Sequence, residues 1–303
     1  MYDIVVVGAG TAGLSAAIYG VRAGKSVLVL EGASYGGQII NTPEIENYPA
    51  IKKISGFEFA TELFNQAKEL GAEVKYEKVV GISLEGNIKK VSTEKEVYEA
   101  KSVILATGAK NRSLGLTNEK KLVGSGISYC ATCDGMFYRG KVVAVNGGGN
   151  KAIEDATFLA NVANKVYVIH RRDEFRAEEA VVAALKKKDN VEFVLNSNIV
   201  EIKEESFAVS AVVVEDKNTN EKREIPVDGL FVAIGQVPDN AAFADVVELD
   251  KAGYIISGED CKTKTEGIFA AGDGRTKEVR QLATAAGDGA VSGIAAAKYC
   301  ETV

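Results

Sequence analysis

The chain has 303 residues, of which 26% are charged and 46% hydrophobic, and its formal net charge is −6. This length favours two domains, and the composition is that of a globular protein with extra glycine. No apolar run reaches the roughly 18 residues that a membrane helix needs, and the negative charge disfavours nucleic acid as a partner. Four cysteines are too few for a disulfide scaffold, so we expect a cytoplasmic protein whose close cysteine pair serves redox or metal chemistry.

The chain opens with an apolar strand that runs into a glycine loop, Gly8-x-Gly10-x-x-Gly13. A helical stretch follows, and a second strand ends at Glu31, 21 positions after Gly10. This spacing is typical of a dinucleotide-binding unit, in which glycines let backbone N–H groups approach a pyrophosphate at a helix N-terminus. Glu31 can accept hydrogen bonds from a ribose diol and would repel a 2′-phosphate, which favours FAD or NAD. The alternative is a helix-packing turn that binds nothing.

Two cysteines stand two residues apart in the stretch 129–136, YCATCDGM, and Asp134 follows the second. A zinc site needs four ligands, but there is no second close pair, and covalent haem needs a histidine directly after Cys133. A structural disulfide across so short a loop would stabilise little. We therefore expect Cys130 and Cys133 to form a dithiol–disulfide couple in which Asp134 passes protons. The alternative for Asp134 is a helix N-cap.

A second glycine loop, Gly147-x-Gly149-x-x-Ala152, repeats the pattern of the first, again between a strand and a helix. Its second strand ends at His170, 21 positions after Gly149. Where the first unit has an acid, this one has a basic cluster: His170, Arg171, Arg172 and Arg176. Arginine side chains suit a phosphate, so this site is expected to prefer NADPH over NADH. The alternative is a solvated basic face at the end of a strand.

Apolar strands close both units with glycine turns, at 102–109, 229–238 and 267–274. After the last of these, the stretch 282–299 predicts a helix rich in small residues, whose N-terminus would suit a flavin ring. Charged stretches at 84–99 and 203–225 predict small antiparallel inserts.

The order of these elements predicts an α/β fold with two Rossmann-like dinucleotide-binding domains, each of three layers (ββα), one inserted into the other. We expect residues 1–112 and 244–303 to form the FAD-binding domain. Residues 113–243 would then form the NADPH-binding domain that carries the cysteine pair. Two nucleotide sites and one redox pair predict an electron path from NADPH through a flavin to the disulfide, and from the dithiol to an outside disulfide.

Over nearly its whole length the chain resembles the low-molecular-weight, bacterial-type thioredoxin reductases. The motifs that carry the resemblance are GAGTAG (8–13), GGQI (36–39), ENYP (46–49), ATGA (106–109), CATCDG (130–135), GGGN (147–150), HRRDEFRAE (170–178), GLFVAIG (229–235), AAGD (270–273) and RQ (280–281). The resemblance implies one FAD per chain, NADPH as electron donor and thioredoxin or a thioredoxin-like protein as partner. It also implies a homodimer and a rotation between the two domains.

The resemblance also implies roles for individual residues. Cys133 corresponds to the flavin-facing cysteine, Cys130 to the cysteine that attacks thioredoxin, and Asp134 to the acid. The residues implied for FAD are Gly8, Gly10, Thr11, Ala12, Gly13, Glu31, Gly36, Gly37, Gln38, Asn47, Ala106, Thr107, Gly108, Gly272, Asp273, Arg280, Gln281 and Leu282. The residues implied for NADPH are Gly147, Gly149, Asn150, Lys151, His170, Arg171, Arg172 and Arg176. No metal site is expected.

The chain departs from the family pattern at a few positions. Thr11 stands where proline is usual, Gly274 where valine is frequent, and Met136 in the apolar pair expected to touch thioredoxin. Lys151 replaces a small hydroxyl residue, and beside a pyrophosphate it would either help binding or mark a shifted cofactor mode. Cys261 is expected in an exposed turn and Cys300 near a frayed C-terminus, both without a role.

Three other functions are compatible with the same fold: a relative with a ferredoxin donor, a small-molecule dithiol oxidase and a non-enzymatic flavin-binding protein. The intact basic cluster argues against the first and the cysteine pair against the last. Residues 32–50 hold no cysteine, which excludes disulfide reductases whose cysteines follow the first helix.

Overall fold

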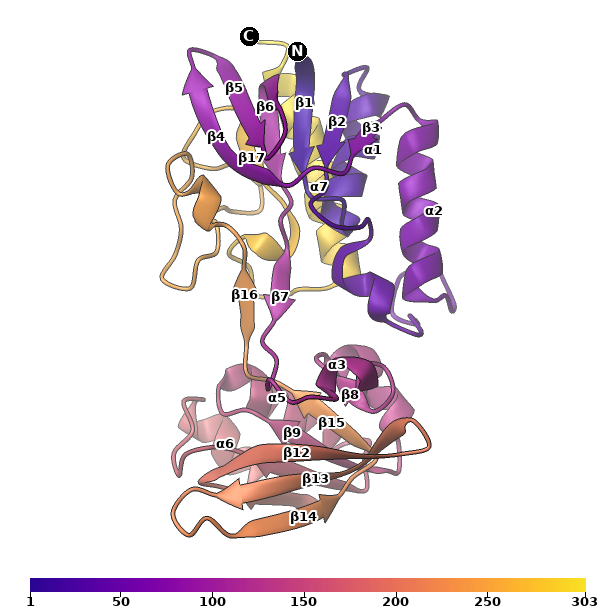
Figure 1. The fold of residues 1–303 in the computed structure, drawn as a ribbon, viewed down its shortest axis with the longest axis vertical. Coiled ribbons are helices and arrows are strands. Elements are labelled where there is room, and N and C mark those ends of the chain that lie inside the picture. Colours follow the sequence, from indigo (N-terminus) through magenta and orange to yellow (C-terminus); the bar gives the residue numbers. More distant parts are fainter. The chain divides into compact units, whose positions relative to one another are not determined.

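The computed structural model describes the whole 303-residue chain, which divides into two compact units (Figure 1). The first unit comprises Met1–Lys110 and Val237–Val303, and the second, Asn111–Gln236, is inserted between these segments. Two short strands that pair with each other, β7 (Ala109–Asn111) and β16 (Gln236–Pro238), carry the chain across the two boundaries.

The second boundary lies at Gln236, earlier than residue 243, where the sequence indicated it. The reason is the hydrogen bonding of Asn240, which ties this segment to the first unit. Its side-chain carbonyl accepts a hydrogen bond of 2.6 Å from the Thr107 hydroxyl, and its amide donates to the backbone carbonyl of Gly274 at 2.9 Å. Phe243 also packs into the apolar core of the first unit.

The first unit contains a seven-stranded sheet with helices on one face. Its elements are β1 (Tyr2–Val7), α1 (Thr11–Arg22), β2 (Val27–Leu30), η1 (Gly37–Asn41), α2 (Gly56–Glu69), β3 (Glu73–Lys75), β4 (Val79–Glu85), β5 (Ile88–Thr93), β6 (Val97–Leu105), η3 (Ala241–Phe243), β17 (Ile268–Ala270), η4 (Gly272–Gly274) and α7 (Leu282–Tyr299). The strand order is β3-β2-β1-β6-β5-β4, and β17 also pairs with β6.

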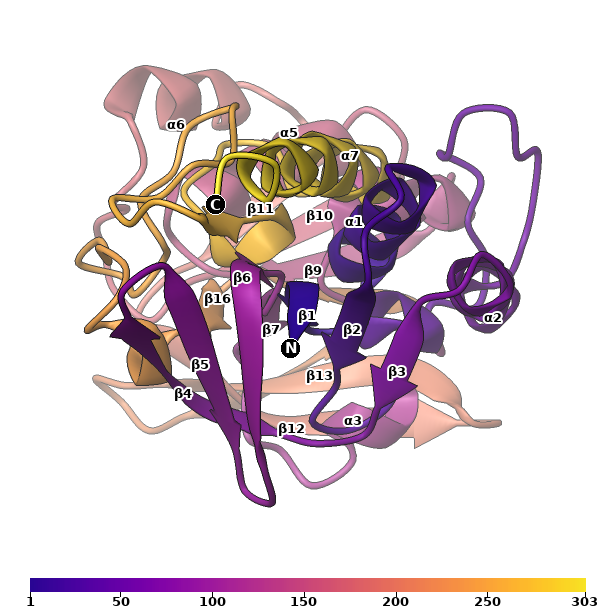
Figure 2. The same ribbon diagram turned by 90° about the horizontal axis from the view of Figure 1, so that it is seen from above.

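Three layers follow from the alternation of side chains along the strands. Ile4 and Val6 of β1 pack toward α1 and α7, which lie side by side on one face of the sheet (Figure 2). Val5 and Val7 pack on the opposite face, against the antiparallel strands β4 and β5. Because β1 pairs in parallel with both β2 and β6, it is the central strand, and the loop after it lies at the carboxyl edge of the sheet.

The second unit repeats these three layers. Its elements are α3 (Glu119–Leu122), β8 (Ile127–Ser128), α4 (Ala131–Asp134), η2 (Gly135–Tyr138), β9 (Val142–Asn146), α5 (Asn150–Leu159), β10 (Lys165–Ile169), α6 (Glu179–Leu185), β11 (Val191–Val194), β12 (Ser197–Glu205), β13 (Ala208–Asp216), β14 (Lys222–Pro226) and β15 (Gly229–Val232). The strand order is β11-β10-β9-β15-β8, all parallel.

Val143 and Val145 of β9 pack against α5 and α6, whereas Ala144 packs against the antiparallel sheet β12-β13-β14. The predicted α/β fold with two three-layer, Rossmann-like units is therefore confirmed. The predicted helix at 282–299 coincides with α7, and both predicted antiparallel inserts are present.

Two predictions about single cysteines are wrong. Cys261 is fully buried, because its turn folds inward with its thiol 3.6 Å from the carbonyl oxygen of Asp288. Cys300 is 4% exposed at the end of α7, where its thiol donates to the carbonyl of Asp3. Burial raises the pKa of both thiols, to about 12 for Cys261 and about 11 for Cys300, so both are unreactive at neutral pH. No helix of the chain is both long and apolar enough to cross a bilayer.

Candidate dinucleotide and disulfide sites

The three glycines of the first loop meet different surroundings. A Cβ on Gly13 would lie 1.9 Å from the carbonyl oxygen of Gly8, and one on Gly8 would lie 2.4 Å from that of Ala106. These two glycines therefore let α1 and β6 close onto the loop. A Cβ on Gly10 would meet nothing within 4 Å. Gly10 thus faces open space at the start of α1, where a pyrophosphate would lie against the helix N-terminus.

Glu31 lies beside this loop with its carboxylate already oriented. Its two oxygens accept hydrogen bonds of 2.8 and 2.9 Å from the backbone N–H groups of Ala9 and Ala33. A cavity of about 520 Å³ opens at this edge of the sheet. Its lining includes Gly8, Glu31, Thr107 and Gly108, so residues predicted for one nucleotide from three distant segments meet here.

The remaining residues predicted for the first nucleotide gather around the same loop. Gly36 forms a bridge with Gly10, and a Cβ on Gly37 would lie 3.5 Å from the Cα of Gly10. The residue Gln38 lies in η1, Thr11 and Ala12 open α1, and a Cβ on Gly272 would touch the side chain of Ala12.

The turn that holds Asp273 carries an unmatched polar atom. The Oδ1 atom of Asp273 is buried and has no hydrogen-bond partner, and burial raises the pKa of this carboxyl. Buried polar atoms are nearly always paired, so this oxygen marks a position where a ligand hydroxyl would fit. The Asn47 amide donates to the Gln281 side chain at 3.2 Å, and Gln281 caps α7 directly before Leu282. Arg280 stacks on Tyr254, 4.4 Å from its ring centre.

Asp288 of α7 fixes the Asp273 turn, a role that sequence reasoning missed. Its Oδ2 accepts from the backbone N–H of Gly272 at 2.8 Å, from Arg275 at 2.8 Å and from Lys277 at 2.9 Å. Burial pushes the pKa of Asp288 upward, but the bonds from Arg275 and Lys277 outweigh it and hold the pKa below its ordinary value. The only sequence signal was that Asp288 is the one acidic residue in the small-residue stretch 282–299.

The second glycine loop likewise has one tightly packed glycine and one open glycine. A Cβ on Gly147 would lie 2.4 Å from the carbonyl oxygen of Ala233, whereas a Cβ on Gly149 would meet nothing within 4 Å. Gly149 precedes Asn150, the first residue of α5, whose side-chain oxygen accepts from the backbone N–H of Glu178. This loop therefore also presents one open glycine at a helix N-terminus.

His170 does not contribute the positive charge that the sequence indicated. Its ring is buried against Gly148, bonds the carbonyl of Glu174 at 3.1 Å and stacks on Phe175. Burial lowers the pKa of His170, and three nearby arginines lower it further. The histidine is therefore neutral at pH 7 and serves as a wall of the loop.

The three arginines of the predicted basic cluster, Arg171, Arg172 and Arg176, are exposed and form no ion pair. Their segment is held over the glycine loop, since the backbone N–H of Arg176 donates to the carbonyl of Gly148 at 2.8 Å. The guanidinium groups are thus available to an anion near the end of β10.

Lys151 is directed away from the open glycine. Its Nζ bonds Oδ1 of Asp155 at 2.6 Å, one turn further along α5. The Asp155 side chain is only 3% exposed, and burial raises the pKa of its carboxyl despite the lysine. In this structure Lys151 pairs with a buried acid of its own helix, so a direct role in binding a pyrophosphate would require it to leave Asp155.

The cysteine pair forms a disulfide at the start of α4, with the two Cα atoms 5.3 Å apart. The backbone N–H groups of Cys133 and Asp134 both donate to the carbonyl of Cys130. A Cβ on Gly135 would lie 2.7 Å from the ring of Phe158, so this glycine lets the disulfide turn pack closely on α5. Within the second unit, the disulfide turn therefore packs on α5, the helix that begins directly after the second glycine loop.

Asp134 makes no capping hydrogen bond, so the N-cap alternative is not supported. Its Oδ2 instead accepts a hydrogen bond of 2.6 Å from the hydroxyl of Ser128, while its Oδ1 is buried without a partner. Burial raises the pKa of the Asp134 carboxyl, and the Ser128 bond opposes this rise. Sequence reasoning missed Ser128, which stands six positions away on β8 and belongs to no motif.

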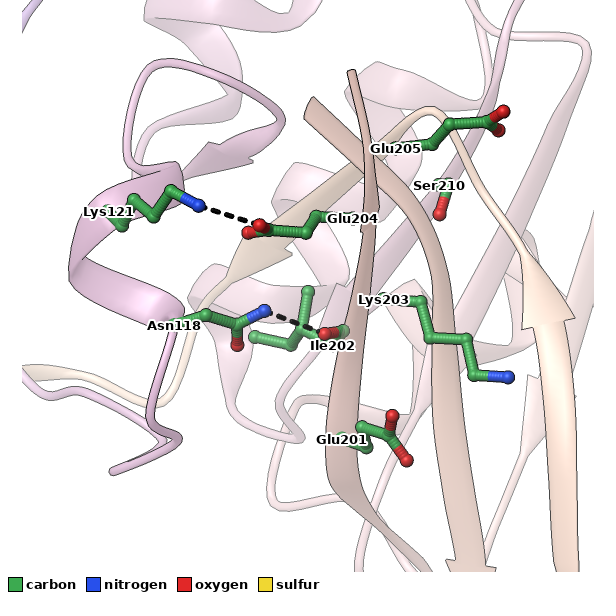
Figure 3. A pocket seen from close by; sticks show the side chains of 8 residues that line it. All are labelled: Asn118, Lys121, Glu201, Ile202, Lys203, Glu204, Glu205 and Ser210. Atoms are coloured by element: carbon green, nitrogen blue, oxygen red, sulfur yellow. Dashed lines mark hydrogen bonds and ion pairs between the residues drawn. The ribbon is translucent and has the colours of Figure 1, made fainter. Parts of the chain in front are cut away.

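A hollow of about 610 Å³ in the second unit carries none of this chemistry. It lies between α3 and the β12–β13 hairpin (Figure 3) and is lined by Asn118, Lys121, Glu201, Ile202, Lys203, Glu204, Glu205 and Ser210. Lys121 bonds Glu204, and Asn118 bonds the carbonyl of Ile202. Because no glycine loop, thiol or predicted site residue lies among the lining residues, we assign no function to this hollow. No group of three or more His, Cys, Asp or Glu side chains is arranged to hold a metal.

Comparison with known proteins places these features in a family context. The model of the pyridine nucleotide-disulphide oxidoreductase family matches residues 2–290. A thioredoxin reductase of Peptoclostridium acidaminophilum is 44% identical over 307 residues, covering 99% of this chain and 98% of that protein. A thioredoxin reductase of Treponema pallidum (strain Nichols) is 42% identical over 303 residues, covering 100% of this chain and 98% of that protein.

A solved structure is similar over both units. The crystal structure of thioredoxin reductase from Streptococcus pyogenes MGAS5005 matches with a TM-score of 0.96 and 40% identity, covering 100% of this chain and 99% of that chain. The match therefore includes both glycine loops and the segment that carries the cysteine pair.

Proposed function

The chain belongs to the pyridine nucleotide-disulphide oxidoreductases and, within them, to the thioredoxin reductases, and on that premise we propose that it uses NADPH and FAD to reduce thioredoxin or a thioredoxin-like protein at Cys130 and Cys133. Membership implies a nicotinamide and a flavin cofactor. The choice of NADPH and FAD, and the residues that hold them, are the proposal. The observation that carries it is the Cys130–Cys133 disulfide on the same unit as the second glycine loop.

The first unit supplies the residues proposed to hold FAD. The open face of Gly10 leaves room for the pyrophosphate, the oriented carboxylate of Glu31 suits a ribose, and the unpaired oxygen of Asp273 suits a hydroxyl. The further proposed contacts are Gly8, Thr11, Ala12, Gly13, Gly36, Gly37, Gln38, Asn47, Ala106, Thr107, Gly108, Gly272, Arg280, Gln281 and Leu282. When bound, the flavin supplies a two-electron link between a nicotinamide and a disulfide.

The second unit supplies the residues proposed to hold NADPH. Gly147, Gly149 and Asn150 form the loop and helix start that would receive the pyrophosphate. Arg171, Arg172 and Arg176 would bind the 2′-phosphate, because they are exposed, unpaired and placed at the end of β10. The buried, uncharged ring of His170 packs beside this site. Lys151 can bind the nucleotide only if it leaves Asp155.

The chain's own groups account for the protons of disulfide reduction. Breaking the S–S bond takes up an electron pair and, when both sulfurs end as thiols, two protons. Asp134 lies directly after Cys133, and burial raises the pKa of its carboxyl, which favours the protonated form and suits this residue to pass on one of those protons. We assign Cys130 to attack on the partner's disulfide and Cys133 to the flavin side.

An anaerobic titration tests this function. The purified protein should be yellow, and NADPH should bleach its flavin band much faster than NADH. Cys130→Ser should abolish thioredoxin reduction while the protein stays yellow. Cys300→Ala, which removes a thiol elsewhere, should keep turnover.

Two other outcomes would redirect the proposal. Bleaching by dithionite but by neither nucleotide would mean that the donor is a ferredoxin-like protein. Bleaching by NADPH without reduction of several thioredoxins would withdraw the partner and favour a small-molecule dithiol oxidase. The homodimer that the family resemblance implies stays a prediction, which sedimentation of the purified protein can check.

A further inference from the structure

Ser128 lies at the centre of the hydrogen bonds around the disulfide turn. It is the second residue of β8 and is 3% exposed. Its Oγ lies 2.6 Å from Oδ2 of Asp134, 3.0 Å from the backbone nitrogen of Cys130 and 3.3 Å from the carbonyl oxygen of Cys130. A single buried hydroxyl thus contacts the acid and both backbone polar groups of one redox cysteine.

The pairing of β8 with β15 fixes the position of this hydroxyl. The register places Ser128 opposite Phe231, a core residue of the second unit. The sheet therefore holds the backbone of Ser128 in place, while the hydrogen of its hydroxyl remains able to rotate.

A hydroxyl has one hydrogen to donate and two positions at which to accept. The N–H of Cys130 always donates to Ser128. When Asp134 is ionised, the Ser128 hydrogen is donated to Oδ2. When Asp134 is protonated on Oδ2, the acid becomes the donor, and the Ser128 hydrogen can turn to the carbonyl oxygen of Cys130. In both protonation states of Asp134, its Oδ2 atom, the Ser128 hydroxyl and the backbone of Cys130 therefore remain hydrogen-bonded.

We propose that Ser128 is a positioning residue that keeps Asp134 hydrogen-bonded both as an acid and as a carboxylate, and so sets the pH range in which Asp134 exchanges a proton with the cysteine pair. The proposal rests on the proposed function, which supplies the electron pair that breaks the S–S bond. As the two sulfurs become thiols, one of the two protons comes from Asp134 and the other from solvent. The Ser128 hydrogen then turns from the carbonyl of Cys130 to the new carboxylate.

Few other titratable groups affect the pKa of Asp134. Tyr138 of η2 is the one whose pKa responds to it, and burial together with Asp134 raises the pKa of Tyr138 to about 12, so it stays protonated. From α5, the residues that pack on this turn at Gly135 are the apolar Phe158 and Leu159. The proton affinity of Asp134 is therefore governed by its burial and by Ser128.

The test compares Ser128→Ala with Ser128→Thr, which keeps the hydroxyl, in the flavin-loaded protein. The infrared band of the protonated Asp134 carboxyl, identified by its loss in Asp134→Asn, is followed as a function of pH. We expect the band to persist to higher pH in Ser128→Ala, because the ionised form has lost its donor, and to return toward the wild-type range in Ser128→Thr. The pH profile of thioredoxin reduction should move to higher pH in the same way, and turnover within that range should fall about tenfold, because the carboxylate left after proton transfer has lost its hydrogen-bond donor.

Controls keep the outcome interpretable. Ser102→Ala removes a buried hydroxyl that bonds the carbonyl of Gly267 in the first unit, and it should leave the band and the profile unchanged. If Ser128→Ala fails to retain flavin, Ser128→Gly takes its place as the hydroxyl-free variant. Identical titrations in wild type and the hydroxyl-free variant would overturn the proposal. A wild-type protein that neither bleaches with NADPH nor reduces thioredoxin would instead overturn the proposed function, which the infrared titration does not require.

Discussion

In the first unit, Glu31 directly follows β2, and its carboxylate accepts hydrogen bonds from the N–H groups of Ala9 and Ala33. In the second unit, His170 directly follows β10, and its neutral ring is buried against Gly148 while exposed arginines come after it. The strands, the loop and the helix before these residues are alike. The difference that bears on the choice of nucleotide therefore lies on the side of the loop where a ribose would lie.

This comparison separates two tasks within one fold. Close glycine packing builds the loop, and the residue after the second strand sets which nucleotide the loop accepts. The oriented carboxylate of Glu31 suits a free 2′-hydroxyl. The neutral ring of His170, with arginines after it, suits a 2′-phosphate. Substitutions should therefore disrupt the building of the loop and the choice of nucleotide independently.

The largest effect is expected where the glycines build the loop. Gly13→Ala places a methyl group 1.9 Å from the carbonyl oxygen of Gly8, so the chain must distort, at a cost on the order of 3–5 kcal/mol. Gly10→Ala meets nothing within 4 Å and should keep the fold, but it should lose flavin because the methyl group enters the space proposed for the pyrophosphate. Denaturant unfolding and flavin content distinguish the two variants.

The second loop supplies the matched control for this prediction. Gly149→Ala also meets nothing within 4 Å, and it should keep both fold and flavin while flavin bleaching by NADPH is lost. Retained NADPH bleaching in Gly149→Ala, or retained flavin in Gly10→Ala, would mean that the open glycines do not mark the nucleotide positions.

A smaller effect is expected at the arginines. Replacing Arg171, Arg172 and Arg176 singly by alanine should lower kcat/KM for NADPH by roughly 10–100-fold at whichever positions pair with the phosphate, since a hydrogen bond to a charged group contributes about 1.5–3 kcal/mol. NADH turnover should change little, because NADH has no 2′-phosphate. Steady-state kinetics with both nucleotides measures the ratio.

Lys187→Ala is the control for charge alone, because Lys187 is an exposed cation of the same unit without an ion pair. An equal loss for NADPH and NADH in the arginine variants would assign the cluster to general electrostatic attraction and not to the phosphate.

The sequence predicted the parts of the sites that depend on local spacing. Gly10 and Gly149 each lie 21 positions before the residue that ends the second strand, and this spacing identified both loops and their order. The cysteine pair was equally visible, because two thiols two residues apart permit little besides redox chemistry or metal binding. These features are local, so no knowledge of packing was needed.

What the sequence did not predict depends on burial and on distant partners. His170 looked like a cation, but packing against Gly148 makes it neutral. Lys151 looked like a phosphate ligand, but a buried acid four positions later holds it. Ser128 and Asp288 belong to no motif, since each acts through a partner that only the folded chain brings near.

The smallest expected effect concerns the neutral state of His170, the ring buried against the second glycine loop. His170 is the chain's only histidine, so one imidazole resonance reports it in an NMR titration. Burial lowers its pKa in the folded protein, whereas in the unfolded chain the value is about 6.5. As the pH falls below the pKa of His170 in the unfolded chain, the unfolded chain binds a proton that the folded protein does not yet bind. The folded state therefore loses stability until the pH falls below the pKa of His170 in the folded protein.

We therefore expect the free energy of unfolding to fall between about pH 7 and pH 5 by up to about 1.4 kcal/mol for each unit by which the pKa is lowered. In His170→Gln this contribution should be absent, while the amide can still donate to the carbonyl of Glu174. Buried carboxyls with raised pKa, such as those of Asp134 and Asp273, titrate with the opposite sign, so the difference between wild type and variant isolates the histidine. An imidazole pKa above about 7 would instead mean that the ring is a cation at neutral pH, and that the two loops differ by charge at this position as well as at the arginines.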